Sequence, residues 1–339
     1  MSSQKNMKTP EVSQPYQDTF SIGKFARRNG TQLGIFGVFI GLWIFFIVMA
    51  PQTFLRSQIY YAFMSTIPFF AMMAMPLTMI VIAGEMDLSF PSIMAMGMIT
   101  FIFTYDATTN VWLAFLAALV TGVFIGWLNG IIVVKFGIPS LVATIGTQYF
   151  WRGAVLVLGQ GKSGTLVYTK ETLLHPFLVG KLGGKFPMQM IWLILVMVLI
   201  WVILNRHKFG AHIYLIGDNV NSAELMGINT GRTRIMGFVL VGLVSAFAGV
   251  VASLNVTYFW PSLGEGYLMR TLASVFLGGT SVFGGVGTIF GSFIGAFIIG
   301  AIEAATVAIG LTGFWTQLIY GLIIVLSVIM HTYLGKRME

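Results

Sequence analysis

Apolar residues run through this chain in long blocks, without the short alternating patterns typical of a water-soluble fold. A membrane-spanning helix needs about 20 mainly apolar residues, and shorter ones are tolerated where protein or a water-filled cavity surrounds them. The pattern predicts an all-α polytopic membrane protein with about ten transmembrane helices, some short or broken. The expected spans are 33–51, 61–83, 91–104, 111–130, 139–158, 189–205, 235–256, 271–283, 287–309 and 313–333. The third and eighth are the shortest, which places them inside the bundle.

Composition supports the same conclusion. Of 339 residues, 57% are hydrophobic and 9% are charged, against about 25% charged in ordinary globular domains. A water-facing surface cannot be built from so little charge, because large exposed apolar patches drive association. A soluble fold, a disordered chain and a multi-domain cytosolic enzyme are therefore excluded.

The positive charges indicate how the chain is oriented. Cytoplasmic segments of membrane proteins carry an excess of Lys and Arg. With ten spans, 12 of the 19 Lys and Arg residues fall on the side of the two termini and 7 on the other. We therefore expect both termini inside, with a cytoplasmic tail at 1–32, a transmembrane domain at 33–333 and a second cytoplasmic tail at 334–339. No apolar segment with a cleavage site follows the first charges, so no cleaved signal peptide is expected.

Two loops stand out between the spans. The loop at about 159–188 is expected outside as an irregular segment, although it carries four lysines. The loop at about 206–234 is expected in the cytoplasm and contains a short helix, with Asn221 and Glu224 as a capping box and Gly227 as its stop. So short a helix is not stable alone in water, so it must lie on its own bundle or dock on a partner.

Glycine recurs every fourth residue near the C-terminal end. Gly287, Gly291 and Gly295 form two overlapping GxxxG units, which allow helices to approach closely in lipid. They indicate packing within one chain or an interface between subunits.

Ionisable residues at membrane depth are costly and are usually paired or functional. Asp87 and Ser89 precede the third span, so they either cap its start or line a solute path. Glu303 lies in the middle of a span and requires protein, a partner charge or water beside it. The candidates for the translocation path or for intramembrane polar roles are Glu85, Asp87, Ser89, Thr144, Arg152 and Arg270.

Other chemistry is not supported by the residues present. The chain has no cysteine and four scattered histidines, so no metal site is expected. No catalytic set is present, because Glu85 and Asp87 would diverge on a helix. The net charge of +8 fits the cytoplasmic bias of membrane proteins better than nucleic-acid binding.

Four blocks of sequence carry a family resemblance. They are GEMDLSFPSIMA at 84–95, IPSLVATIGTQYFWRGAVLVLGQG at 138–161, FGAHIYLIGDNVNSAELMGIN at 209–229 and LGGTSVFGGVGTIFGSFIGAFIIG at 277–300. In this order they resemble the permease subunits of ATP-binding-cassette (ABC) importers for simple sugars, of the ribose, xylose, galactose and autoinducer-2 type. Branched-chain amino-acid permeases are more distant relatives. The resemblance covers about residues 60–333.

The resemblance implies a transport subunit in the bacterial cytoplasmic (inner) membrane, not an enzyme. It implies an ABC ATPase subunit, an extracytoplasmic solute-binding protein and a second permease copy or a paralogous permease as partners, with membrane lipid around the chain and no nucleic acid. No cofactor is expected on this chain, whereas ATP and Mg are expected on the ATPase. The implied contact residues for that ATPase are Gly217, Asn219, Ala223, Glu224, Gly227 and Ile228. The alternative is a stand-alone secondary carrier or channel, in which intramembrane carboxylates would couple ions.

Two positions depart from the family pattern. Glu85 stands where the family has a second glycine. Residues 268–271, Leu-Met-Arg-Thr, replace the family's Glu-Leu-Asp-Ala, which exchanges an acidic pair for an apolar residue and a cation. Arg270 is expected either to pair with Glu265 or another acid, or to contact the binding protein or an anionic solute.

Overall fold

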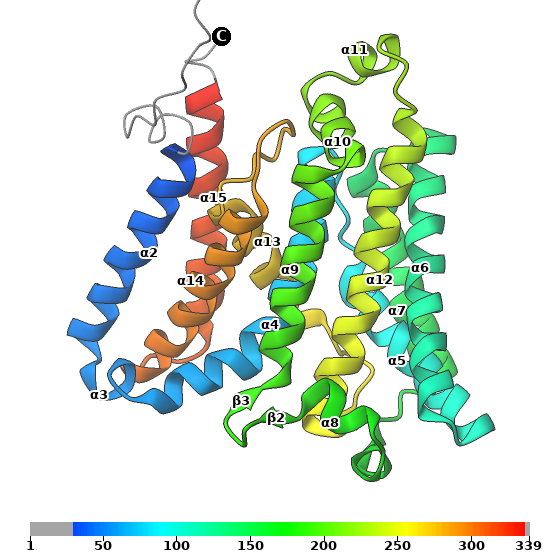
Figure 1. Ribbon diagram of the computed structural model, residues 1–339, viewed down its shortest axis with the longest axis vertical. Helices are drawn as coiled ribbons and strands as arrows, with labels where there is room; N and C mark the ends of the chain where they lie inside the picture. Colours follow the sequence, from blue (N-terminus) through cyan, green and yellow to red (C-terminus); the bar gives the residue numbers. More distant parts are fainter. Residues whose placement is uncertain (1–29, 336–339) are drawn as a thin grey trace, which may run out of the picture.

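The computed structural model describes the backbone of residues 30–335 and the side chains of residues 32–329. The expected cytoplasmic tails at 1–32 and 334–339 lie outside the described residues, except for 30–32 and 334–335, which belong to the first and last helices. The described helices run nearly side by side and form a bundle (Figure 1). Both described ends of the chain lie at the end of the bundle that carries α11, as an even number of spans requires (Figure 1).

The elements follow one another along the chain in a simple order. The longer helices are α2 (Gly30–Met49), α4 (Ser57–Ile82), α5 (Phe90–Thr108), α6 (Val111–Phe136), α7 (Ser140–Leu158), α9 (Met188–Arg206), α10 (Lys208–Asp218), α12 (Thr230–Val256), α13 (Leu268–Leu277), α14 (Ile289–Ala308) and α15 (Phe314–Gly335). Short helices are α3 (Pro51–Phe54), η1 (Val167–Glu171), α8 (Leu174–Val179), α11 (Val220–Leu225) and η2 (Glu265–Tyr267). The strands are β1 (Gly164–Thr165), β2 (Lys181–Leu182), β3 (Phe186–Pro187) and β4 (Tyr258–Phe259).

The predicted spans are confirmed as helices, with corrections to their lengths. Within the described residues, eight helices are long and apolar enough to cross a membrane. The expected span at 271–283 is wrong in length, because α13 has only 10 residues, about 15 Å and half of the hydrocarbon thickness. The expected short span at 91–104 is also wrong, because α5 has 19 residues. Both helices lie inside the bundle, as expected.

Helix α4 forms the centre of the bundle. Every residue from Ile67 to Ala83 is buried, and α9, α12, α13 and α14 all pack against it. Pro68 and Pro76 lie within this helix, yet it continues unbroken for 26 residues. The surrounding helices therefore hold α4 in place where two backbone donors are missing.

Glycine brings α6 and α12 into backbone contact. Gly122, Gly126 and Gly130 lie at every fourth position of α6, and a Cβ on Gly126 would overlap the backbone carbonyl of Phe238 in α12. A Cβ on Gly122 would overlap the carbonyl of Gly242. This GxxxG repeat is visible in the sequence but was not among the expected packing residues.

The expected repeat at Gly287, Gly291 and Gly295 packs inside the same chain. Gly291 and Gly295 in α14 lie against the backbone of Gly278 and Ser274 at the end of α13. Gly287 precedes α14, in the turn that joins it to α13. These contacts favour the interpretation of packing within one chain.

The loop at 159–188 is more regular than expected. Strand β1 pairs antiparallel with β4, which follows α12, and β2 pairs with β3 in a small hairpin. Helix α8 packs against α9 and α12. This loop closes the end of the bundle opposite α11 (Figure 1).

The α6–α12 contact yields a stability prediction. Gly126→Ala places a methyl group where the Phe238 carbonyl lies, so the helices must separate, at about 1–3 kcal/mol of stability. We expect a lower thermal unfolding midpoint in detergent. The matched control is Gly146→Ala in α7, where no atom lies within 4 Å and where alanine favours the helix. Equal midpoints for the two variants would contradict the close contact.

Candidate functional site

An irregular segment crosses the interior of the bundle between α4 and α5. We call residues 83–89 the Asp87 segment. Its backbone is not helical, and Asp87 and Ser89 have no exposed surface. Non-helical backbone at membrane depth requires partners from the protein, because lipid offers no hydrogen bonds. The side chains around it supply them.

Two hydroxyl groups of α7 bind this backbone. Ser140 Oγ accepts a hydrogen bond from the Met86 N–H at 3.0 Å, and Thr144 Oγ1 accepts one from the Leu88 N–H at 3.1 Å. Thr144 Oγ1 also lies within hydrogen-bond distance of the Met86 carbonyl, at 3.2 Å. Thr144, a candidate for the solute path, therefore holds the Asp87 segment in place.

Asp87 organises the start of α5. Its Oδ1 accepts hydrogen bonds from the backbone N–H and the hydroxyl of Ser89, both at 2.7 Å. Asn129 of α6 donates from Nδ2 to Ser89 Oγ at 2.7 Å. These bonds fix Ser89, the N-cap residue of α5, but neither the Asp87 nor the Ser89 side chain accepts a hydrogen bond from an N–H of the first helical turn. The buried Asp87 Oδ2 has no hydrogen-bond partner among the described residues.

Two glycine turns meet α10 at the α11 end of the bundle. We call this contact, formed by Gly84, Gly217, Gly284 and Gly285, the glycine junction. A Cβ on Gly217 of α10 would overlap the Ile82 carbonyl and would lie 2.6 Å from the Gly285 nitrogen. The Gly285 N–H donates to the Ile82 carbonyl at 2.9 Å. Gly217 is therefore an internal contact and not a surface one.

A side chain of α10 strengthens the junction. The Tyr214 hydroxyl donates to the Gly287 carbonyl at 2.9 Å. This bond ties α10 to the turn between α13 and α14, while Gly217 ties it to the end of α4. Helix α10 thus contacts both non-helical turns at once.

Three ion pairs engage charged residues inside the described bundle, whereas the buried Asp87 is held by its hydrogen bonds from Ser89. Glu85 pairs with Arg234 near the start of α12. The Arg270–Glu303 pair is 2.7 Å long, from Nη2 to Oε1, and the Arg152–Glu265 contact is 3.4 Å, from Nε to Oε1. Arg270 therefore pairs with an acid, as one expectation had it, but that acid is Glu303 and not Glu265.

Arg152 binds backbone rather than lining an open path. Its guanidinium donates to the carbonyl of Pro261, to Pro91 at 3.0 Å and to Leu263 at 2.9 Å. Pro91 lies in the first turn of α5, and the other two carbonyls belong to the irregular chain before α13. One buried side chain thus joins α7, α5 and the entry to α13, a role that sequence spacing could not reveal.

The short helix α11 differs from its predicted form at one end. It begins at Val220, and its N-cap is Asn219, which accepts from the Ser222 N–H at 2.9 Å. The expected capping box of Asn221 and Glu224 is wrong, because Glu224 instead accepts a hydrogen bond from Thr230 at 2.7 Å. Gly227 has φ +80°, and the Ile228 N–H donates to the Ala223 carbonyl at 3.1 Å, so glycine ends the helix as expected.

The expected contact residues build this helix, whereas other residues form its surface. Asn219 caps it, Ala223 is buried beneath it, and Gly227 and Ile228 close it. The exposed apolar residues are Val220, Leu225 and Met226, which we call the α11 tip. Leu225 is 91% exposed. Apolar residues within a polar loop are the signal that could have identified the tip.

No catalytic or metal-binding arrangement is found in the described part of the chain. Groups of three or more His, Asp or Glu side chains that could hold a metal ion are absent there. The site consists of hydrogen-bonded turns, ion pairs and a docking-type helix.

The Arg152 contacts predict a structural effect. Arg152→Gln leaves at least two of the three carbonyls without a donor, which should destabilise the folded chain by about 2–4 kcal/mol. We expect a lower unfolding midpoint in detergent than for Arg206→Gln, a matched change at the exposed end of α9. If both variants unfold at the wild-type temperature, Arg152 does not hold these three segments together.

Comparisons with known proteins agree with this architecture. The family described as branched-chain amino acid transport system / permease component matches residues 59–328. The autoinducer 2 import system permease protein LsrC of Yersinia pestis (strain Pestoides F) is 31% identical over 254 residues, covering 75% of this chain and 71% of that protein. LsrC of Yersinia enterocolitica is 30% identical over 277 residues, covering 80% and 75%. No solved structure matches the chain.

The match covers nearly all of the described helices, and these relatives are permease subunits of transport systems, not enzymes. The family implies an ATPase and a solute-binding protein as partners. The chain therefore belongs to the family of branched-chain amino acid transport system permease components and is a multi-pass, inner-membrane permease subunit of an ABC importer.

Proposed function

We propose that this chain provides the membrane path for a small, polar, sugar-like solute, which an extracytoplasmic binding protein delivers. The likeness to autoinducer 2 import permeases supports a solute of this class. A separate ATPase binds ATP and Mg, and a second permease copy or a paralogous permease completes the path. A stand-alone carrier would leave the α11 tip without a role.

The observation that carries the proposal is the α11 tip. Two exposed apolar side chains of the six-residue helix and that of its C-cap residue, Met226, lie at the end of the bundle where both described chain ends lie. Counted along the sequence with the two tails, Lys and Arg are in excess on the side of the termini, which supports a cytoplasmic position for that end. An exposed apolar patch rimmed by polar residues is typical of a protein interface. The α11 tip is therefore the docking surface for the ATPase.

The connections of α11 explain how docking could drive transport. Helix α10 leads directly into α11 through Asn219, which ends one helix and caps the other. Helix α10 contacts both glycine turns through Gly217 and Tyr214. A displacement of α11 when the ATPase closes would therefore move the Asp87 segment and the turn before α14 together. Such a movement favours one of two conformational states of the permease only if the contacts between the ATPase and this chain differ in strength between those states.

The docking surface can be tested by one apolar-to-acidic change. Leu225→Asp places a charge at the centre of the tip, and we expect at least about tenfold less ATPase to co-purify in mild detergent. The matched control is Leu173→Asp, because Leu173 is 78% exposed at the opposite end of the bundle. Undiminished ATPase recovery with Leu225→Asp would rule out the tip as the interface.

The coupling route can be tested separately from docking. Tyr214→Phe removes the hydrogen bond to Gly287 and keeps the ring, which weakens the link by about 0.5–1.5 kcal/mol. We expect normal ATPase co-purification but less solute taken up per ATP hydrolysed, measured in proteoliposomes with the complete importer. Tyr258→Phe, a change at an exposed tyrosine at the opposite end, serves as the control. An unchanged ratio of uptake to hydrolysis would place the coupling elsewhere.

A further inference from the structure

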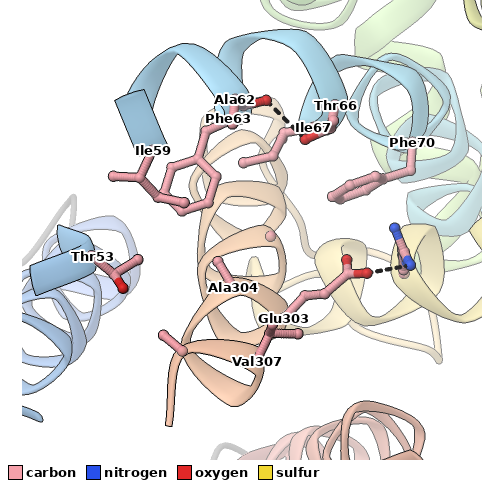
Figure 2. Close-up of a pocket in the computed structure, with 13 residues that line it drawn as sticks. Thr53, Ile59, Ala62, Phe63, Thr66, Ile67, Phe70, Glu303, Ala304 and Val307 are labelled. Carbon is pink, nitrogen blue, oxygen red and sulfur yellow. Dashed lines mark hydrogen bonds and ion pairs between the residues drawn. The ribbon is translucent and has the colours of Figure 1, made fainter. Parts of the chain in front are cut away.

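A pocket of about 440 Å³ opens in the half of the bundle away from α11. Four helices line it: α3, the first half of α4, the start of α13 and the second half of α14 (Figure 2). Phe63, Ile67 and Phe70 form an apolar wall, and Thr66 adds a hydroxyl group beside it. Glu303, which pairs with Arg270, lies across the pocket from this wall (Figure 2).

The Arg270–Glu303 pair lies well inside the membrane-spanning region, which limits what can face the open side of the pocket. Glu303 lies five residues before the end of α14, about 7–8 Å inside a membrane-spanning helix. The side chains remain 29% and 37% exposed. An ionised side chain facing hydrocarbon costs about 2.5–3.5 kcal/mol or more. The open side of the pocket therefore faces water or protein, and not lipid.

The Arg270–Glu303 pair differs from the Arg152–Glu265 and Glu85–Arg234 pairs in the hydrogen bonds and the burial of its side chains. Arg152 is bound to three carbonyls, and Glu85 is almost fully buried against Arg234. For Arg270 and Glu303, the described side-chain hydrogen bonds comprise their mutual bond alone. The Tyr267 ring centroid lies 6.0 Å from the guanidinium carbon, and Tyr320 of α15 is close enough to interact electrostatically with both charges. A guanidinium carries five N–H donors and a carboxylate accepts at two oxygens. Most of this hydrogen-bonding capacity is free to meet a solute.

The composition of the pocket indicates the class of solute. The N–H donors of Arg270 lie next to the carboxylate oxygens of Glu303. Two neighbouring hydroxyl groups of a solute can therefore accept a hydrogen bond from Arg270 and donate one to Glu303. The paired charges leave no net charge to attract an ion. The Phe70 ring lies in the wall and stacks on Tyr267, with centroids 6.5 Å apart and planes at 28°. An aromatic surface beside polar groups fits a small molecule with one apolar face and several hydroxyls.

We propose that this pocket is the water-filled outer part of the solute path and that the Arg270–Glu303 pair selects a neutral polyhydroxylated solute there. This inference rests on the proposed function, because it assigns a place and a selectivity to the path. The position fits delivery from outside, since α3 and the start of α4, which line the pocket, lie at the end of the bundle opposite α11 (Figure 1).

The absence of cysteine from the chain allows a direct test. Ala304→Cys places a thiol in the pocket wall next to Glu303. The assembled importer in right-side-out vesicles is treated with two membrane-impermeant methanethiosulfonates, one trimethylammonium and one sulfonate, and labelling of this chain is followed by mass. We expect both reagents to react. Val120→Cys, exposed on the far side in α6, is the control and should react more slowly.

Removing one charge should change the preference between reagents. Glu303→Gln leaves Arg270 unpaired and should raise the ratio of sulfonate to trimethylammonium labelling about tenfold, whereas Arg270→Gln should lower it about tenfold. The double variant Arg270→Gln/Glu303→Gln should return the ratio to that of the parent. This last variant keeps the test valid if a single unpaired charge prevents folding.

Protection from labelling tests the solute class. Saturating D-ribose, as a neutral polyhydroxylated probe, should slow labelling of Ala304→Cys, and the same concentration of acetate should not. Protection by acetate alone would overturn the assigned class. No labelling by either reagent would overturn the open path in favour of a covered surface.

The control for the proposed function is recovery of the ATPase with the same Ala304→Cys protein. ATPase recovery with an unreactive pocket would reject only the inference about the pocket. Loss of the ATPase from well-folded protein would instead count against the proposed function.

Discussion

Hydrocarbon neither donates nor accepts hydrogen bonds, so each non-helical stretch inside this bundle depends on partners that the protein itself supplies. The Asp87 segment receives them from hydroxyl groups of α7 and from its own aspartate and serine. The chain before α13 receives them from Arg152. These partners also fix how α5, α7 and α13 stand relative to one another. The polar residues of the interior are therefore first of all the framework on which a path can be built.

Glycine allows parts of this framework to make rigid contacts of backbone with backbone. At the glycine junction, backbone meets backbone between α10, the end of α4 and the turn before α14. Side chains can absorb a displacement by changing rotamer, whereas contacting backbones cannot. Interfaces of this kind have a few discrete arrangements rather than a continuous range. The region beside α11 is thus suited to transmitting a movement. The pocket between α4, α13 and α14 lies at the far ends of α4 and α14, the two helices whose near ends meet at this junction.

Much of the architecture follows from the sequence, because a block of apolar residues has few alternatives to a spanning helix. The ends of the elements do not follow as easily. Helix α13 ends at Leu277 because Gly279 adopts φ +81° and the Thr280 N–H donates back to the Val275 carbonyl. The partners of charged residues are harder still. Glu85 pairs with Arg234 and Arg152 binds Pro261, each far away along the chain. Only the packed fold brings these groups together, whereas the repeat at Gly122, Gly126 and Gly130 is readable from spacing alone.

The length of α13 has a consequence for how the protein is made. Ten residues cannot cross the bilayer, and Arg270 near the start of this helix opposes its release into lipid on its own. Its counter-charge, Glu303, and its packing partners, Gly291 and Gly295, all lie in α14, the next helix to be synthesised. The insertion machinery must therefore retain α13 until α14 has emerged and then release the two as a hairpin. Membrane integration of this part of the chain is a cooperative step that waits for translation to pass Glu303.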